Sequence, residues 1–439
     1  MVSVVDRIIE IENKSHLYEY VDDKGIPVWD VLRYDVIKAI EYKYNPNKSM
    51  LPKSSLAQRI IILLESAIAF LRLFFLGEKR VLFFASLRYK DKDGQCYDRV
   101  ANDLILRVDK GERVVLDTTP RNDTRYKTLT TPVGLFYALC KKYELNQDFS
   151  DYVVEELNKG FQDNVITSER LQYIYSQFVS QTIMFNWILK RTKPEKIFIS
   201  YGRFKPLCWT AKRLGIPTWL MQHSLIERDD ATLSGTCPDK RFAINADVLL
   251  TFGTYWGDYL KHLMSVQVIG NRILSKSDVN VAYNGPIVFA SSLYQGPYIS
   301  DFLVGFASKH PDLSFVYKLH PGEKQYMQRY RDLFINCHNV RVVLDEMTMD
   351  ELLVTCSLVV LVSSTTFYEA LNLKKCVAIY NIKEFESITR FLLKVPNSYP
   401  FTEEEELENI IKDATFYEDQ SISFFEPFNE ELAEQLINQ

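Results

Sequence analysis

The sequence predicts an α/β protein made of two halves, each a doubly wound parallel sheet. Short apolar runs alternate with longer amphipathic stretches along most of the chain, and this rhythm starts again after Asn284-Gly-Pro286. Strands that alternate with helices at this spacing are typical of parallel sheets. The length of 439 residues also exceeds what one hydrophobic core usually organises, so two domains are expected.

Four segments follow from this pattern. Residues 1–77 are expected to form a helical N-terminal extension, and residues 78–285 a first Rossmann-like domain. Residues 286–420 are expected to form a second Rossmann-like domain, and residues 421–439 a closing C-terminal helix. The boundary between the two domains is placed at the Asn-Gly-Pro turn signal.

The apolar runs and amphipathic stretches predict the individual elements. In the first half, strands are expected at 80–85, 113–117, 196–200, 217–222 and 247–252. Helices are expected at 29–40, 59–76, 97–108, much of 130–190, 206–214 and 254–264. In the second half, strands are expected at 287–291, 313–319, 340–344, 358–362 and 376–380. Helices are expected near 298–309, from 349, from 368 and within 424–438.

Composition excludes several classes of protein. The net charge of −5 argues against a general nucleic-acid binder, which needs a basic surface. The seven cysteines are widely spaced without a C-x-x-C pair, and there are only six histidines, so neither a disulfide framework nor a zinc site is expected. The charged N-terminus carries no secretory signal. A cytoplasmic protein is therefore expected.

The segment 59–76 is apolar on nearly all sides. Gln58, Glu65, Arg72 and Lys79 recur every seven residues and give it one narrow polar stripe. Two charges within the segment disfavour a membrane-spanning helix. Two alternatives stay open: a helix packed into the core or against a partner, and a helix lying in the membrane interface, which would place the protein peripherally on the inner face of the plasma membrane.

Two strand ends of the second half carry groups that suit a phosphate. The four hydroxyl residues Ser363, Ser364, Thr365 and Thr366 stand between the buried run 358–362 and the start of a helix. Free N–H groups and hydroxyls at such a point favour anions. The strand 313–319 ends at His320. Because ligands of parallel sheets bind at the carboxyl ends of strands, a nucleotide site is expected here. Further candidates are Lys318, Pro321 and Ser292.

The motifs Lys318-Leu-His-Pro321 and Ser363-Ser-Thr-Thr-Phe-Tyr-Glu-Ala-Leu371 in the second half resemble those of GT-B glycosyltransferases. The resemblance covers roughly residues 195–380 and is strongest to bacterial enzymes that build surface polymers. These are the polysialyltransferases, the capsule Kdo transferases and the CDP-glycerol glycerophosphotransferases. It implies two domains facing a central cleft, with the donor phosphate held by His320 and Ser363–Thr365. It also implies that Glu369 binds the donor ribose.

Gly215-Ile-Pro-Thr-Trp-Leu-Met-Gln-His-Ser224 is similar to another strand end of that family, with Ser224 in the usual place of glycine. Transfer of a sugar needs a base for the acceptor hydroxyl. Asp93 and His223, each after a predicted strand, are the two candidates. The family's paired-acid-glycine motif is matched only in part by Lys92-Asp-Gly94, which weakens a sialyl donor. Because phosphate charge is neutralised by side chains and N–H groups, neither metal nor other cofactor is expected.

The expected function is therefore a metal-independent GT-B glycosyltransferase of bacterial capsule or lipopolysaccharide synthesis. Its partners would be a nucleotide-sugar donor and a glycan or lipid-linked glycan acceptor, with no nucleic acid. A CDP-polyol phosphotransferase of the same fold is an alternative, with Lys318, Arg203 and Lys205 around the transferred phosphate. A non-catalytic scaffold for polysaccharide assembly is another. A nicotinamide oxidoreductase is disfavoured because no G-x-G-x-x-G follows a predicted strand.

Overall fold

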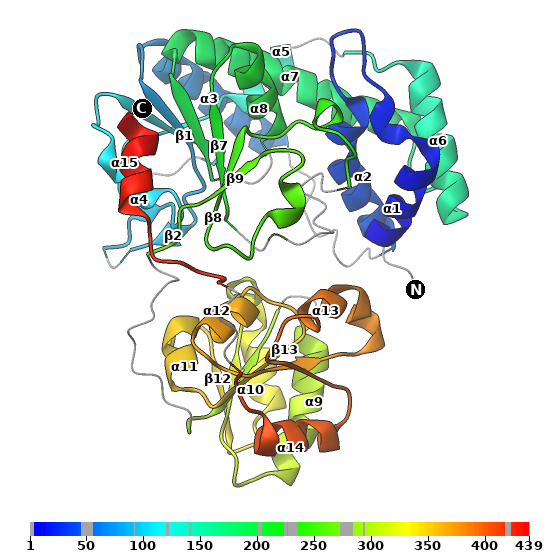
Figure 1. The fold of residues 1–439 in the computed structure, drawn as a ribbon, viewed down its shortest axis with the longest axis vertical. Coiled ribbons are helices and arrows are strands. Elements are labelled where there is room, and N and C mark those ends of the chain that lie inside the picture. Colours follow the sequence, from blue (N-terminus) through cyan, green and yellow to red (C-terminus); the bar gives the residue numbers. More distant parts are fainter. Residues whose placement is uncertain are drawn as a thin grey trace. The chain divides into compact units, whose positions relative to one another are not determined.

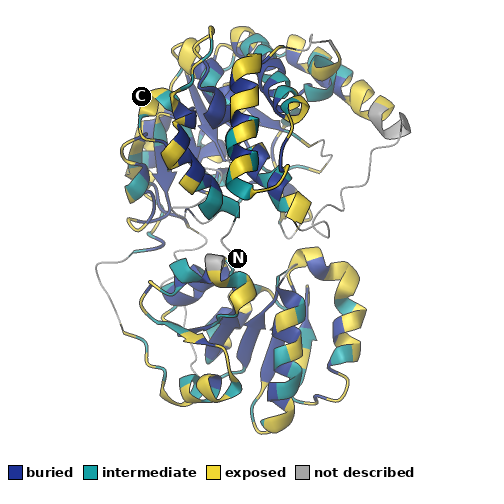
Figure 2. Cartoon of the chain, turned by 90° about the vertical axis from the view of Figure 1, so that its right-hand side faces the viewer, coloured by how far each residue is buried: buried dark blue, intermediate teal, exposed yellow. Residues whose placement is uncertain are grey.

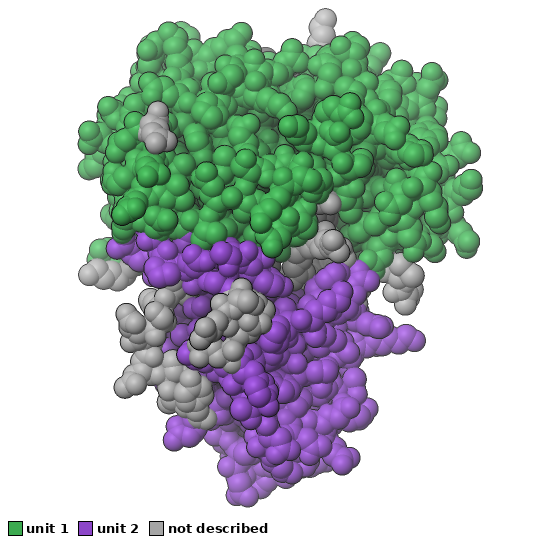
Figure 3. Space-filling view, viewed as in Figure 1, with its two compact units in different colours: residues 1–251, 256–269, 429–439 green, residues 252–255, 270–428 purple. Residues whose placement is uncertain are grey.

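Two compact α/β units make up the chain in the computed structural model (Figure 1). Unit 1 consists of Met1–Thr251, Trp256–Ile269 and Asn429–Gln439, and unit 2 of Phe252–Tyr255 and Gly270–Phe428 (Figure 3). Each unit contains a parallel sheet, which confirms the predicted fold class. The structure describes residues 4–44, 56–91, 93–119, 123–139, 143–200, 204–223, 226, 236–272, 284–292, 295–417 and 423–438.

Unit 1 holds a seven-stranded sheet in the order β5-β4-β1-β6-β7-β8-β9. Every neighbouring pair is parallel. Its strands are β1 (Val81–Phe84), β4 (Arg113–Asp117), β5 (Thr128–Thr130), β6 (Lys196–Ile199), β7 (Thr218–Met221), β8 (Val248–Thr251) and β9 (Ser265–Val268). A two-stranded antiparallel hairpin, β2 (Tyr89–Lys90) and β3 (Cys96–Tyr97), follows β1.

The helices of unit 1 include the predicted N-terminal ones. They are α1 (Val4–Ser15), α2 (Val28–Tyr44), α3 (Leu56–Phe74), α4 (Asn102–Arg107), α5 (Val133–Leu139), α6 (Gln147–Phe161), α7 (Ser168–Thr192), α8 (Lys205–Arg213) and α15 (Glu430–Asn438). Capping residues define both ends of the long helix α7. The side chain of Thr167 accepts from Arg170 N at its start, and Lys193 ends the helix in the left-handed conformation.

The division into units differs from the predicted segments in three respects. The helices α1–α3 pack within unit 1, and unit 2 takes in Phe252–Tyr255 and then the continuous stretch from Gly270, ahead of the predicted boundary. The C-terminal helix α15 belongs to unit 1. Its last carbonyls accept from Arg80 Nη1 at 2.6 Å and Lys196 Nζ at 3.1 Å, which satisfies groups that a helix end otherwise leaves unpaired.

Two predicted helices of unit 1 take another form. Residues 254–264 form turns and a short 3-10 helix, η4 (Asp258–Leu260), because Gly257 stands at φ 82° directly before it. The helix predicted at 97–108 begins later, at Asn102. The buried Asp98 carboxylate accepts the N–H groups of Val100 and Ala101, both at 2.8 Å, and so fixes a turn ahead of α4.

Unit 2 holds a six-stranded parallel sheet in the order β12-β11-β10-β13-β14-β15. Its strands are β10 (Ile287–Ala290), β11 (Phe315–Lys318), β12 (Val340–Val343), β13 (Leu358–Leu361), β14 (Val377–Tyr380) and β15 (Ser398–Phe401). Its helices are α9 (Gly296–Lys309), η5 (Pro321–Tyr326), α10 (Met327–Leu333), α11 (Met349–Thr355), α12 (Thr366–Asn372), η6 (Lys383–Phe385), α13 (Glu386–Leu392) and α14 (Glu404–Asp413).

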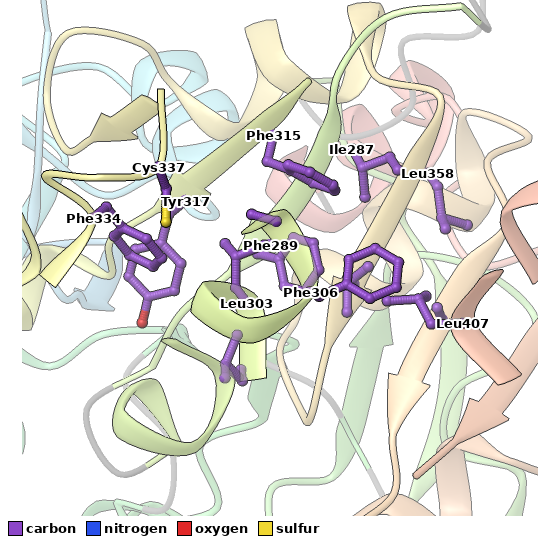
Figure 4. Close-up of a cluster of buried hydrophobic side chains, with 14 of the residues drawn as sticks. Ile287, Phe289, Leu303, Phe306, Phe315, Tyr317, Phe334, Cys337, Leu358 and Leu407 are labelled. Carbon is purple, nitrogen blue, oxygen red and sulfur yellow. The ribbon is translucent and has the colours of Figure 1, made fainter. Parts of the chain in front are cut away.

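The core of unit 2 lies between its sheet and the helices that cover it. Phe289 of β10 and Phe315 of β11 pack with Leu303 and Phe306 of α9 in one buried cluster (Figure 4). The central strands β10, β11 and β13 are buried at every position, whereas the helices keep exposed outer faces (Figure 2). Coverage on both faces explains why these strands read as continuous apolar runs.

A buried ion pair anchors the N-terminal helices in unit 1. Arg33 Nε of α2 donates to Glu12 Oε1 of α1 at 2.6 Å, and both side chains are 2% exposed. Trp29 Nε1 donates to the same oxygen at 2.8 Å, and Thr236 Oγ1 donates to Oε2 at 3.1 Å. Burial lowers the pKa of the Arg33 guanidinium, but Glu12, Tyr18 and Asp30 together raise it more, so the net shift is upward. The carboxylate is thus satisfied on both oxygens.

Replacing Glu12 with alanine leaves the Arg33 guanidinium buried without its carboxylate. We expect the free energy of unfolding of unit 1 to fall by about 3 to 5 kcal/mol. Urea unfolding of the full chain measures this loss. Glu10→Ala is the matched control, because Glu10 pairs with Arg7 on the surface of the same helix and the expected loss is under about 1 kcal/mol. Equal losses in the two variants would contradict the assignment.

Candidate functional site

Three adjacent strands of unit 2 end in polar residues at the same edge of the sheet. The strand β10 lies between β11 and β13 and runs parallel to both. Ser291 and Ser292 follow β10, His320 follows β11, and Ser363, Ser364 and Thr365 follow β13. Together with Gln295, we call Ser292, His320, Ser363, Ser364 and Thr365 the strand-end cluster. The sequence predicted each of these positions except Gln295.

The buried carboxylate of Glu323 joins the ends of β10 and β11. Its Oε1 accepts from Ser291 Oγ at 3.0 Å and from Tyr330 OH at 2.9 Å, and its Oε2 accepts from His320 N at 3.0 Å. Glu323 is 1% exposed. Burial and the neighbouring Glu323 raise the pKa of Tyr330 to about 12, so the phenol keeps its proton and remains a donor at neutral pH.

Gly296 gives this carboxylate its space. A Cβ at Gly296 would stand 2.4 Å from Glu323 Oε1, 2.5 Å from Tyr330 OH and 2.7 Å from Ser291 Oγ. The carbonyl of Gly296 also accepts from Tyr317 OH at 2.9 Å. The first residue of α9 is therefore packed against the carboxylate itself, and only glycine fits there.

His320 is held in one tautomer by its own turn. Its Nδ1 accepts from Gly322 N at 3.0 Å, and its backbone N–H donates to Glu323, which completes a capping box at the start of η5. Because Nδ1 accepts, the proton of the neutral ring lies on Nε2, which is a hydrogen-bond donor. Pro321 occupies the first position of η5, where no N–H is needed.

Gln295 links the ends of β10 and β13. Its Oε1 accepts from Ser292 Oγ at 2.8 Å and from Ser363 N at 3.2 Å. Since Ser363 N–H is a donor, the side-chain atom facing it must be the oxygen, so the orientation of the amide is settled. The NH₂ end of Gln295 therefore remains as a donor of the strand-end cluster.

The turn from Ser363 to Thr366 leaves two backbone donors open. Ser364 Oγ accepts from Thr366 N at 3.2 Å and donates to Thr366 Oγ1 at 3.1 Å. Among the hydrogen bonds of the described residues, none uses the N–H of Ser364 or Thr365. The helix α12 that follows has only seven residues, so its dipole is short. What this turn offers to a ligand is therefore its individual N–H groups.

Two other predicted donor-site residues lie differently. The ammonium of Lys318 donates to the carbonyl of Leu344 beside β12, and Lys318 is 8% exposed. Burial lowers its pKa. Successive side chains of β11 point to opposite faces of the sheet, so Lys318 lies on the face opposite Tyr317. There its ammonium is bound by the protein itself. Glu369 lies in the first turn of α12 and is half-buried. Its predicted role with a ribose stays a prediction.

Both candidate bases belong to unit 1. Asp93 is exposed in the turn between β2 and β3, where its N–H donates to Asp91 Oδ1 at 3.0 Å. Asp91 also pairs with Arg125 at 2.9 Å, which assigns it to holding the hairpin. His223 follows β7 and is exposed. In the sheet, β6 separates β1 from β7, so the two candidates arise from strand ends two positions apart.

The hairpin that carries Asp93 also presents aromatic rings and cations. The rings of Tyr89 and Tyr97 lie 6.3 Å apart across the two strands. The Arg125 guanidinium is 4.5 Å from the Tyr97 ring centre, and that of Arg99 is 5.6 Å from the Tyr89 ring centre. Each of the two rings therefore has a guanidinium over one of its faces.

Sequence reasoning missed Glu323, and it placed Gln295 and Gly296 in a segment that could line the donor site without giving either residue a role of its own. Glu323 had a usable signal, since an acidic residue three positions after a helix start is the spacing of a capping box. Gln295 and Gly296 carry no such signal, because their role depends on residues distant in sequence. Ser224 and Arg203 lie outside the described residues. Across the described part of the chain, no group of three or more His, Cys, Asp or Glu is placed to hold a metal ion.

No protein-family model matches the sequence, and no curated protein matches it significantly. Solved structures similar to this chain include the UDP-GlcNAc 2-epimerase of Methanocaldococcus jannaschii, at 11% identity and a TM-score of 0.46, covering 82% of this chain and 98% of that chain. MurG of Acinetobacter baumannii is similar at 13% identity and a TM-score of 0.44, covering 76% and 90%. The glycotransferase of kitacinnamycin shows 10% identity and a TM-score of 0.46 over 76% and 90%. At these values the likeness adds nothing about substrate or activity.

Replacing Gly296 with alanine places a methyl group against the Glu323 carboxylate. We expect the melting temperature of unit 2 to fall by several degrees, because two hydrogen bonds to a buried charge must lengthen. Differential scanning calorimetry of the full chain measures the shift. Gly305→Ala in the same helix is the control: its Cβ would meet Glu404 Oε1 only at 3.4 Å, and alanine favours helix. An unchanged melting temperature in Gly296→Ala would refute the packing described.

Proposed function

We propose that the chain is a glycosyltransferase and that unit 2 binds the phosphate of its nucleotide-sugar donor. One observation carries this proposal: the strand-end cluster offers donors from three adjacent strand ends of one parallel sheet. These are His320 Nε2, the NH₂ of Gln295 and the N–H groups of Ser364 and Thr365. Ligands of parallel α/β sheets bind outside the carboxyl ends of the strands.

The chemistry of the cluster suits a leaving phosphate. In glycosyl transfer, a base takes the proton of the acceptor hydroxyl, and the acceptor oxygen bonds to the anomeric carbon of the donor sugar. The bond between that carbon and the phosphate oxygen breaks. Negative charge builds on that phosphate, so fixed N–H donors stabilise the transition state more than the ground state. Within the proposal, Asp93 and His223 remain the two candidates for the base. The acceptor is proposed to be a glycan of a bacterial surface polymer.

The CDP-polyol phosphotransferase alternative is less well supported. That reaction transfers the phosphate itself and calls for additional cations around it. Of the three cations predicted for that role, Lys318 is bonded to a backbone carbonyl and Lys205 pairs with Asp30 at 2.6 Å. Arg203 lies outside the described residues. The cluster of neutral donors fits a leaving phosphate better than a transferred one.

A thermal-shift screen of the full chain against CMP, CDP, UDP, GDP and dTDP tests the proposal. At about 100 times its dissociation constant, a nucleotide should add roughly 2.7 kcal/mol to the stability of the unit that binds it. In a domain of this size, that corresponds to a rise of about 5 to 10 °C. We expect one nucleotide to raise the melting temperature more than the others, because a donor site recognises both the base and the number of phosphates.

His320→Ala should lower the affinity for that nucleotide at least about tenfold, because a hydrogen bond to a charged phosphate is lost. His338→Ala is the matched control. His338 is also exposed but precedes β12, at the opposite edge of the same sheet. Equal affinity in the two variants would reject the cluster as the phosphate site. A chain that binds none of the five nucleotides would instead be the non-catalytic scaffold.

A further inference from the structure

The helix α3 and Phe75, the residue directly after it, present a stripe of large apolar side chains to solvent. Ile61, Leu64, Ile68, Leu71 and Phe75 follow one another at spacings of three or four residues. Leu64 is 61% exposed, Leu71 55% and Phe75 77%. Ile60, Ile62 and Phe74 widen this stripe and are likewise exposed. We call these eight residues the α3 stripe.

The opposite side of α3 is firmly packed, so the exposure of the stripe is not a sign of loose docking. Ser66 Oγ accepts from Gly134 N of α5 at 3.1 Å, and a Cβ at Gly134 would stand 2.8 Å from that oxygen. Leu73 is 1% exposed, and Phe70 stacks on Trp187 of α7 with ring centres 4.4 Å apart. The helix therefore holds its apolar stripe outward on a rigid base.

Cations border the stripe at its C-terminal end. Arg72 is exposed in the last turn of α3. Arg191 of α7 donates from Nε to Phe74 O at 2.7 Å, and its guanidinium lies 5.5 Å from the Phe74 ring centre. Lys190 beside it is also exposed. These positive charges gather at one end of an apolar surface on a chain whose net charge is −5.

We propose that α3 is a membrane-docking helix that lies in the interface of a bilayer containing anionic lipids. Leu64, Leu71 and Phe75 would enter the acyl boundary, while Arg72 and Arg191 meet the headgroup phosphates. A protein partner would need hydrogen-bonding groups among the apolar ones. The eight residues of the α3 stripe are all apolar, and the charged residues Glu65 and Arg72, exposed in the described part of α3, belong to the narrow polar stripe of the same helix. No helix in the described ranges is long and apolar enough to cross a membrane.

This docking deepens the proposed function, because it would bring the chain to lipid-linked acceptors. Its evidence is independent, however, since the stripe lies in unit 1 and the strand-end cluster in unit 2. Vesicle binding needs no nucleotide. A failure of the nucleotide screen therefore leaves the docking proposal standing, and a failure of vesicle binding leaves the donor site standing.

Co-sedimentation of the full chain with vesicles tests the proposal. We expect binding to vesicles of phosphatidylcholine with phosphatidylglycerol, and at least about tenfold weaker binding to phosphatidylcholine alone. The double variant Leu64→Ser with Leu71→Ser should lose at least about tenfold in affinity for the anionic vesicles, because two apolar side chains that would enter the acyl boundary are replaced by polar ones. Arg72→Glu should reduce the preference for the anionic lipid, and added salt should do the same.

The double variant Leu106→Ser with Ile335→Ser is the matched control. Leu106 and Ile335 are 52% and 69% exposed, and neither belongs to α3. Circular dichroism melting of each variant verifies the fold. Retention of full vesicle binding by Leu64→Ser with Leu71→Ser would overturn the proposal. The proposal would also be overturned if the wild-type chain bound neither vesicle type but formed a dimer in light scattering. If the same double variant abolished that dimer, a second copy of the chain would be what covers the α3 stripe.

Discussion

The buried carboxylate of Glu323 is the constraint on which the candidate site depends. A charge removed from water is tolerated only when hydrogen bonds satisfy it. Here the donors are Ser291, Tyr330 and the backbone of His320, which come from the ends of two strands and from α10. Meeting this requirement fixes the ends of β10 and β11, demands glycine at 296, and sets the backbone that orients the His320 ring.

Unit 1 uses the same device at the carboxyl edge of its own sheet. The carboxylate of Asp98 is 2% exposed and accepts from Ser86 N at 2.7 Å, from the hydroxyl of Ser200, and from two N–H groups ahead of α4. It thereby joins the ends of β1 and β6, as Glu323 joins those of β10 and β11. In both units a buried acid holds the loops rigid, and the residues left exposed beside them are the ones available for chemistry.

The sequence predicted the strands well because both faces of each sheet are covered, so buried strands read as apolar runs. It did not show β5, β9 or β15, whose residues are partly exposed or polar. The sequence also placed His320 and Ser363–Thr366 at strand ends of one sheet, because each motif directly follows the apolar run of its strand. It assigned Lys318 to phosphate, since the carbonyl that engages this ammonium lies 26 residues away. Such long-range partners leave no local pattern, and the same holds for Ser291 and Glu323.

The central claim is that the N–H groups of Ser364 and Thr365 meet the phosphate of a nucleotide. The most direct test is NMR of the full chain, labelled with ¹⁵N at serine and threonine only, during titration with the nucleotide selected by thermal shift. Assignment uses Ser364→Ala and Thr365→Val. The account predicts that these two amide resonances move downfield and saturate together, as N–H groups do on bonding to phosphate. If they stay in place while amides elsewhere in the chain move, the phosphate binds at another site and the claim is wrong.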